Sequence, residues 1–306
     1  MTRYRFHTAD VFTERAFGGN QLAVLPDARG LTDEQMLAVT REFNYSESVF
    51  VLPPDDASNT RRLRIFTPGG ELPFAGHPTL GAAHVLAAIG EILLDADPAR
   101  IVFEEGVGPV RVAVRHDDGV PVSAQLTAAQ PPEYGPKPPT HHALARVLSI
   151  DANEIGGEGL TPRAVSCGVP FLMVPLRDRA ALGRAEIDLD QWAQVLADFW
   201  APHVYLVCGD PERPGSDLRA RMFAPGMGIV EDPATGAAAT ALAGYLGAFD
   251  NRSDGTRRWV VEQGVEMGRP SILHVEADKR DGAIVEIRVG GSTVMMAEGT
   301  IEVPAA

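Results

Sequence analysis

The chain has 306 residues, of which 45% are hydrophobic and 22% charged, and its formal net charge is −14. This length allows two domains, each with its own hydrophobic core. The 27 basic residues are outnumbered by 41 acidic ones, which argues against nucleic-acid binding because that function needs a clustered basic surface.

Targeting, membrane and metal signals are also missing from the sequence. The first residues, MTRYRFHTADVF, lack the apolar core of a signal peptide, and no apolar run approaches the ~18 residues of a membrane-spanning helix. Cys167 and Cys208 are the only cysteines, and without Cys-x-x-Cys spacing they predict neither a disulfide framework nor a zinc site. We therefore expect a cytoplasmic protein that holds no metal and binds neither membranes nor nucleic acid, with both cysteines buried as small hydrophobic residues.

The first half consists mostly of short β-branched and aromatic runs between Gly, Pro and Asp turn signals. The letters TDEQ at 32–35 read as a capping box that opens a helix ending near residue 43, and an Ala- and Gly-rich helix is expected over 78–89. The strands expected here are 3–12, 21–26, 46–52, 61–67, 101–105, 110–115 and 122–127.

The second half repeats this order of elements. The letters DLDQ at 188–191 open a helix to about residue 199, and a second Ala- and Gly-rich helix is expected over 233–246. The Pro-rich segment QPPEYGPKPP reads as the linker, which predicts domains over 1–129 and 140–306, the last strand being able to return to the first half. The strands expected here are 163–167, 171–176, 203–207, 217–223, 257–261, 272–277, 283–289 and 293–303.

Two phrases occur once in each half. RIFTPGG begins at Arg64 and returns as RMFAPGM at Arg221, an offset of 221 − 64 = 157. HPTLGAA begins at His77 and is answered by DPATGAA at Asp232, an offset of 232 − 77 = 155. We expect two related halves in which His77 and Asp232 occupy equivalent positions and the chemistry lies where the halves differ.

The two Ala- and Gly-rich helices lack a polar face, so we expect both to be buried, each with a sheet curled around it. Each is expected to begin at its proline, which makes the polar residue before it, His77 or Asp232, the N-cap. Small residues then leave backbone amides uncovered, and amides at a helix N-terminus form an anion site. Two such sites could converge across an interdomain cleft on a carboxylated substrate.

Three ionisable residues are candidates for catalysis. Glu47 follows strand alternation onto an apolar face, where loss of water raises the pKa of a carboxylate towards neutrality, as a general acid or base requires. Each candidate also has a structural explanation: Glu47 as a strand-end residue turned to water, His77 as a buried histidine bonded to a carbonyl, and Asp232 as a simple N-cap. No Gly-x-Ser-x-Gly elbow, Walker loop or Gly-x-Gly-x-x-Gly motif offers another chemistry.

With these residues in view, the chain resembles the PhzF-like isomerase family, which has the diaminopimelate-epimerase-like fold. The matching segments are FTERAFGGNQLAV, NYSESVFV, FTPGGELPFAGHPTLGAAHVL, EDPATGAAA and EQGVEMGRPS, which together span most of the chain. The resemblance implies an α+β fold with two pseudo-symmetric domains, each a β-barrel-like sheet around a central helix, and an active site between them. It also implies a homodimer that works without a cofactor.

The resemblance also assigns roles to residues. It makes Glu47, His77 and Asp232 the catalytic residues. The substrate-binding positions that it implies are Ser46, Gly76, Gly236 and Ala237. Two of this chain's residues depart from the family pattern and bear on the substrate: Ala237 replaces a frequent small hydroxyl residue, and Gln21 replaces the proline of Gly-Asn-Pro.

The predicted function is a cofactor-independent isomerase that moves a proton within a small conjugated carboxylate, similar to trans-2,3-dihydro-3-hydroxyanthranilate isomerase. One alternative is an amino-acid racemase or epimerase, which would need acids on both faces of one carbon. Related epimerases place a cysteine at the start of each central helix, whereas this chain has His77 and Asp232 there, so a two-thiol mechanism is disfavoured. A further alternative is a carboxylate-binding protein without catalysis.

Overall fold

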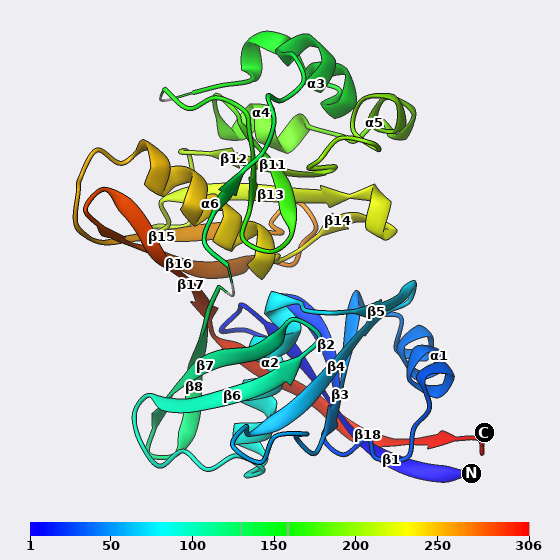
Figure 1. Ribbon diagram of the computed structural model, residues 1–306. Coiled ribbons are helices and arrows are strands. Elements are labelled where there is room, and N and C mark those ends of the chain that lie inside the picture. Colours follow the sequence, from blue (N-terminus) through cyan, green and yellow to red (C-terminus); the bar gives the residue numbers. More distant parts are fainter. Residues whose placement is uncertain (129, 158, 306) are drawn as a thin grey trace. The chain divides into compact units, whose positions relative to one another are not determined.

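A computed structural model describes residues 1–128, 130–157 and 159–305 (Figure 1). The chain divides into two compact units, one formed by Met1–Thr127 with Gly290–Ala306 and the other by Ala128–Val289. The predicted domain boundary at Ala129 lies outside the described residues. The last strand belongs to the first unit, where it pairs with the first strand (Figure 1).

The first unit contains a mixed sheet in the order β18, β1, β2, β3, β4, β6, β7, β8, with β5 paired to β4. Its neighbours are antiparallel except for β2 with β3 and β4 with β6. The strands are β1 Thr2–Val11, β2 Asn20–Leu25, β3 Glu47–Leu52, β4 Arg61–Thr67, β5 Gly70–Leu72, β6 Ala99–Glu105, β7 Gly108–Asp117, β8 Val120–Thr127 and β18 Thr293–Val303. The helices are α1 Asp33–Phe43 and α2 Gly76–Ala88.

The second unit repeats this pattern. Its sheet has the order β9, β10, β11, β12, β13, β15, β16, with β14 paired to β13. The parallel pairs are β11–β12 and β13–β15, which correspond to β2–β3 and β4–β6 of the first unit. The strands are β9 Glu133–Tyr134, β10 Arg163–Ser166, β11 Pro170–Pro175, β12 His203–Cys208, β13 Leu218–Ala224, β14 Ile229–Asp232, β15 Gly255–Gln263, β16 Ser271–Arg280 and β17 Ala283–Gly291. The helices are α3 His141–Leu148, α4 Arg179–Arg184, α5 Leu189–Val195 and α6 Gly236–Phe249, with 3-10 turns η1 Ala152–Glu154 and η2 Pro225–Met227.

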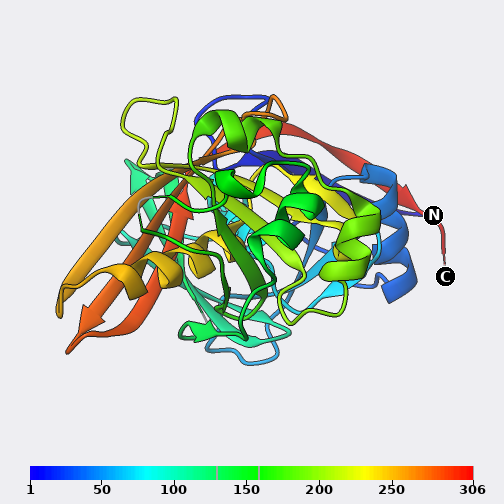
Figure 2. The ribbon, with the colours of Figure 1, turned by 90° about the horizontal axis from the view of Figure 1, so that it is seen from above.

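The two Ala- and Gly-rich helices are buried, as predicted. Every residue of α2 from Gly76 to Ala87 is buried, and the helix packs against β1, β2 and β8. In the second unit α6 packs against β10, β11 and β16, and both ribbon views show it beside β15 and β16 (Figure 1 and Figure 2). The α+β class is confirmed. No helix in the described part of the chain is long and apolar enough to cross a membrane.

Gly81 shows why small residues are needed in α2. A Cβ atom at this position would lie 2.5 Å from Leu22 Cδ2 and 2.7 Å from Val11 Cγ2, both in a fully packed core. We expect Gly81→Ala to destabilise the chain by about 1–2 kcal/mol, because overpacking costs more than the gain in helix propensity. Thermal unfolding measures this, and a variant as stable as the wild type or more so would contradict the packing shown here.

The shorter helices were predicted at their starts more accurately than at their ends. Thr32 caps α1 with the predicted capping box, its side chain accepting from the Gln35 amide while the Gln35 side chain accepts from the Thr32 amide. Asp188 likewise caps α5, but that helix ends at Val195 rather than near residue 199. A helix that the sequence did not predict, α4, packs against β12 and β13.

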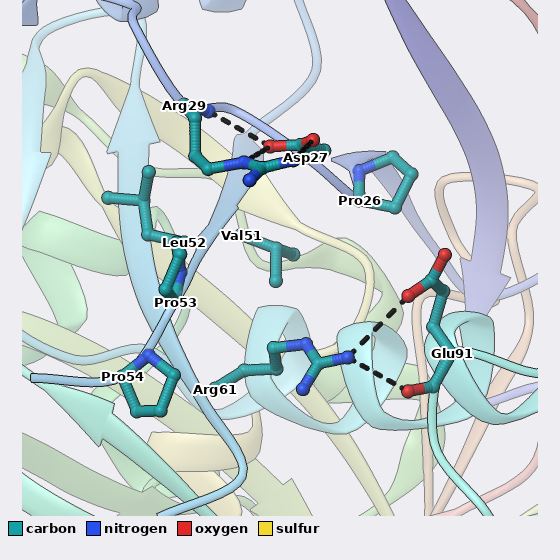
Figure 3. A pocket seen from close by; sticks show the side chains of 9 residues that line it. All are labelled: Pro26, Asp27, Arg29, Val51, Leu52, Pro53, Pro54, Arg61 and Glu91. Carbon is teal, nitrogen blue, oxygen red and sulfur yellow. Dashed lines mark hydrogen bonds and ion pairs between the residues drawn. The ribbon is translucent and has the colours of Figure 1, made fainter. Parts of the chain in front are cut away.

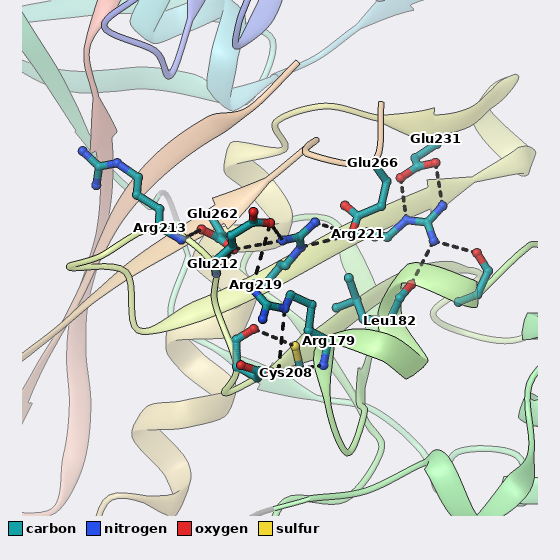
Figure 4. Close-up of polar contacts among 12 residues, drawn as sticks. Arg179, Leu182, Cys208, Glu212, Arg213, Arg219, Arg221, Glu231, Glu262 and Glu266 are labelled. Carbon is teal, nitrogen blue, oxygen red and sulfur yellow. Dashed lines mark hydrogen bonds and ion pairs between the residues drawn. The ribbon is translucent and has the colours of Figure 1, made fainter. Parts of the chain in front are cut away.

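The repeated Arg-x-Phe phrase builds the same contact in each unit. The guanidinium of Arg64 lies 5.1 Å from the ring centre of Phe66 and pairs with both carboxylate oxygens of Glu71. In the second unit Arg221 lies 4.9 Å from the ring centre of Phe223 and pairs in the same way with Glu231 (Figure 4). Residues i and i+2 share one face of a strand, which explains the spacing of the phrase.

The residues that correspond to each other at the starts of α2 and α6 are not those predicted. The paired glutamates give an offset of 231 − 71 = 160, and the helix starts Gly76 and Gly236 give the same value. The additional residues in the second hairpin include η2. The predicted equivalence of His77 and Asp232 is therefore wrong.

At the correct offset, Ala237 corresponds to His77 and Leu72 corresponds to Asp232. The N-cap predictions are also wrong. His77 lies in the first turn of α2, whose N-cap is Ala75, and Asp232 ends β14, three residues before the α6 N-cap Thr235. Both helices start at the glycine rather than at the proline.

Candidate functional site

Glu47 is a buried carboxyl at the first residue of β3. The parallel pairing of β3 with β2 places it opposite Leu22, and the residue is 8% exposed. Burial raises the pKa of the Glu47 carboxyl to about 7, while a hydrogen bond with Ser46 acts in the opposite direction. A carboxyl that titrates near neutrality can both accept and return a proton.

His77 lies beside Glu47. Its Nδ1 atom is 3.5 Å from Glu47 Oε2, and the imidazole is 4% exposed. The placement follows from α2 beginning at Gly76, which puts His77 in the first helical turn and next to the start of β3. The carboxyl and the imidazole therefore form a buried pair able to exchange a proton.

Asn20, the first residue of β2, connects this pair to Ser46. Its Oδ1 accepts a hydrogen bond of 2.9 Å from Ser46 Oγ, and its Nδ2 lies 3.4 Å from His77 Nδ1. Because an amide nitrogen can only donate, this contact uses the lone pair of Nδ1 and favours the imidazole tautomer with its proton on Nε2. His77 Nδ1 is thus a hydrogen-bond acceptor, which Asn20 and a protonated Glu47 can use only in turn.

Asp232 lies in the second unit, in a separate network of hydrogen bonds. Thr235 Oγ1 donates to Asp232 Oδ2 at 2.5 Å, and Gln263 Nε2 donates to Thr235 Oγ1 at 3.1 Å and to the Asp232 carbonyl at 2.8 Å. Gln263 Oε1 in turn accepts from the buried Tyr205 hydroxyl at 3.0 Å. The single Thr235 hydrogen is therefore directed at Asp232, which presents a carboxylate oxygen to it.

The predicted site residues fall into two groups. The first unit brings together Ser46, Glu47 and His77, with Gly76 adjacent in the chain. The others, Asp232, Gly236 and Ala237, belong to the second unit, where Gly236 begins α6. Sequence reasoning did not assign a role to Asn20 or to Gln263, although both lie in the segments on which the resemblance rests.

The cysteines take no part in either group. Both are buried, Cys167 after β10 and Cys208 at the end of β12. Burial raises the pKa of the Cys167 thiol to about 12 and also raises the pKa of Cys208. Neither thiol is set to ionise near neutral pH.

The described residues include no group of three or more His, Cys, Asp and Glu side chains that could hold a metal ion. A surface pocket of about 370 Å³ in the first unit contains none of the predicted site residues (Figure 3). Its two guanidinium groups are already paired, Arg29 with Asp27 and Arg61 with Glu91. The residues that line it are Pro26, Asp27, Arg29, Val51, Leu52, Pro53, Pro54, Arg61 and Glu91.

Comparison with known proteins gives matches over nearly the whole chain. Residues 9–299 match the family described as phenazine biosynthesis-like protein. An uncharacterized isomerase from Mesorhizobium japonicum is 40% identical over 297 residues, which cover 95% of this chain and 96% of that protein. The trans-2,3-dihydro-3-hydroxyanthranilate isomerase of Pseudomonas aeruginosa is 33% identical over 296 residues, covering 97% and 98%.

A solved structure shares the fold. The Bacillus anthracis phenazine biosynthesis protein of the PhzF family superposes with a TM-score of 0.89, covering 99% of this chain and all of that one. The two sequences are 22% identical, so this likeness concerns the fold alone.

Proposed function

The chain belongs to the phenazine biosynthesis-like (PhzF) family and is an isomerase, and from this premise we propose that it moves a proton within a small conjugated carboxylate without a cofactor. One observation carries the proposal. A buried carboxyl, Glu47, has its pKa raised by burial to about 7 and lies 3.5 Å from an imidazole nitrogen of His77. This arrangement suits transfer of a proton from one carbon to another.

In the proposed reaction the Glu47 carboxylate removes a proton from a carbon next to the conjugated system. The electron pair of the broken C–H bond enters the π-system, and Glu47 then returns the proton to a different carbon of the same system. Both transfers use one carboxyl, so no external acid, base or oxidant is consumed. The substrate of the Pseudomonas aeruginosa relative is of this kind, since its name describes a dihydro-hydroxyanthranilate.

His77 is proposed to accept the proton from Glu47 and to return it. With its proton on Nε2, the imidazole has a single lone pair on Nδ1, which accepts either from Asn20 or, in its place, from a protonated Glu47. Ser46 and the amides near Gly76 would bind the substrate carboxylate. On the family resemblance alone we also propose Asp232 as a catalytic residue and Gly236 and Ala237 as substrate-binding residues, with Asp232 oriented by its hydrogen bond from Thr235.

Racemisation or epimerisation is less well supported. A symmetric mechanism would require an acid–base group at the same position of both central helices. The position equivalent to His77 in α6 is Ala237, whose side chain cannot carry a proton. The family's isomerase activity likewise makes a purely carboxylate-binding protein the weaker alternative.

The pH profile tests the role of Glu47. Because the base must be ionised, we expect kcat/KM to fall about tenfold for each pH unit below 7 and to approach a maximum between pH 7 and 8. The profile is measured as solvent deuterium incorporated into the substrate carbon across pH 5–8. A profile without a fall down to pH 5, as a base with the ordinary Glu pKa near 4 would give, would contradict the assignment.

A further inference from the structure

A second carboxyl, that of the half-buried Glu105, reaches the first turn of α2 from the end of β6. Its Oε1 atom lies 2.6 Å from Thr79 Oγ1, and that hydroxyl lies 2.7 Å from the carbonyl oxygen of Ala75. Thr79 is fully buried. Glu105 Oε2 is also buried and has no hydrogen-bond partner in the described part of the chain.

Counting hydrogens favours the neutral form of Glu105. The Thr79 hydroxyl has one hydrogen and two close oxygen neighbours, and the Ala75 carbonyl can only accept, so both contacts are hydrogen bonds only when Thr79 donates to Ala75. The 2.6 Å contact then needs a hydrogen from Glu105, which must be a carboxylic acid. An ionised Glu105 would take the Thr79 hydrogen and leave two oxygen lone pairs facing each other at 2.7 Å.

In the second unit the corresponding strand position carries an amide, which contacts the N-cap of α6 rather than a residue within the helix. The parallel pairs Arg62–Glu104 and Arg219–Glu262 place Glu105 and Gln263 at corresponding positions, one residue further along β6 and β15. Gln263 donates from Nε2 to Thr235 Oγ1 at the start of α6. An amide can donate at any pH, whereas a carboxyl in this position donates only while it is protonated.

We propose that Glu105 is a positioning residue which, as a neutral carboxylic acid, fixes the first turn of α2 and with it Gly76 and His77, and that its ionisation releases this turn. The consequence for activity rests on the function proposed above; the protonation state does not. Burial raises the pKa of the Glu105 carboxyl to about 8, which places the change just above neutral pH.

The charged groups on neighbouring elements are engaged elsewhere or exposed. On β4, Arg61 pairs with Glu91 and Arg62 with Asp55. On β6 itself, Glu104 accepts from the amides of Asp55 and Asp56. The other titratable groups of β6, β7 and α2 are Arg100, Arg111, Arg115 and Asp117, all exposed, the partly exposed His116, and the buried His77 and His84. Burial lowers the pKa of His84 to about 4, so it is neutral in this range.

The test compares the full-length wild type with Glu105→Gln, which keeps a donor to Thr79 but cannot ionise. Carboxyl-carbon NMR of protein labelled in its Glu side chains is followed from pH 4 to 10, and the resonance missing from the variant is assigned to Glu105. We expect this resonance to titrate near pH 8. Titration near pH 4 would overturn the proposal, whatever substrate the enzyme uses.

Activity provides the second readout. Above pH 8 we expect the wild-type kcat to fall about tenfold per pH unit, while Glu105→Gln keeps its activity to higher pH. An identical alkaline limb in both proteins would overturn the positioning role. If neither protein turns over any substrate while Glu105 titrates near 8, the proposed function fails and the protonation state stands.

Discussion

Glu47→Gln is expected to lower kcat by about 10²–10⁴-fold with little change in KM, because general acid/base catalysis is typically worth that much. Glutamine has nearly the same shape as glutamate, so the contacts of β3 with β2 and with Ser46 are kept. What is lost is the carboxyl that titrates near pH 7 beside His77. Initial rates on the substrate measure the loss of kcat. Thermal unfolding of both proteins shows whether the variant keeps its fold.

The matched control is Glu42→Gln, which makes the same change at an exposed position of α1. It should leave kcat within twofold of the wild type, as expected for a surface substitution away from the site. Wild-type turnover by folded Glu47→Gln would remove Glu47 from the mechanism. An unfolded variant would show that the carboxyl is needed for packing, and Glu47→Asp would then test the chemistry by shortening its reach.

Arg221→Ala is expected to destabilise the second unit by about 3–5 kcal/mol, since removing one partner of a buried ion pair leaves the other charge uncompensated. The Arg221 side chain is 8% exposed and that of Glu231 16%. Arg221 also donates to the carbonyls of Leu182 and Ala185, tying the end of α4 to β13 (Figure 4). In Arg221→Ala these two carbonyls and the Glu231 carboxylate would all lose the Arg221 donor.

The first unit offers the control, because Arg64 makes the same contact nearer the surface. Its partners Glu71 and Asp33 are 41% and 72% exposed, so Arg64→Ala should cost only about 1 kcal/mol. Denaturant unfolding followed by circular dichroism compares the two variants. All three tryptophans, Trp192, Trp200 and Trp259, lie in the second unit, so their fluorescence isolates the effect of Arg221→Ala. Equal losses in both variants would contradict this account.

The class of fold and its central helices could be predicted because local composition determines them. An Ala- and Gly-rich segment without a polar face has to be buried, and α2 and α6 are. The capping box at Thr32 is likewise a short-range pattern. The end of α5 and the existence of α4 depend on packing between distant segments, which the sequence pattern does not contain.

The predicted equivalence of His77 and Asp232 was wrong because it rested on the similarity of two short sequence segments and not on contacts in the structure. HPTLGAA and DPATGAA align at an offset of 155, but the ion pairs of Glu71 and Glu231 and the starts of both helices give 160. Only the structure shows that Asp232 ends a strand while His77 lies within a helix. The two residues therefore play different parts in the molecule.

Within the candidate site, the burial of Glu47 was predicted correctly, but from strand alternation, which would bury only every second residue of β3. Both faces of β3 are buried at Glu47, Ser48, Val49 and Phe50. The roles of Asn20 and Glu105 could not be predicted, because each depends on a contact with a residue of α2 more than twenty positions away. A hydrogen count at Thr79 becomes possible only when those contacts are known.

NMR in D₂O tests whether Glu47 transfers a proton to and from a substrate carbon. The wild type and Glu47→Gln are each mixed with a panel of cyclic dienes and amino acids that carry carboxylates. We expect deuterium at a carbon of a conjugated carboxylate with the wild type and not with the variant. Equal incorporation by both proteins, or exchange confined to an amino-acid α-carbon with loss of optical rotation, would contradict it.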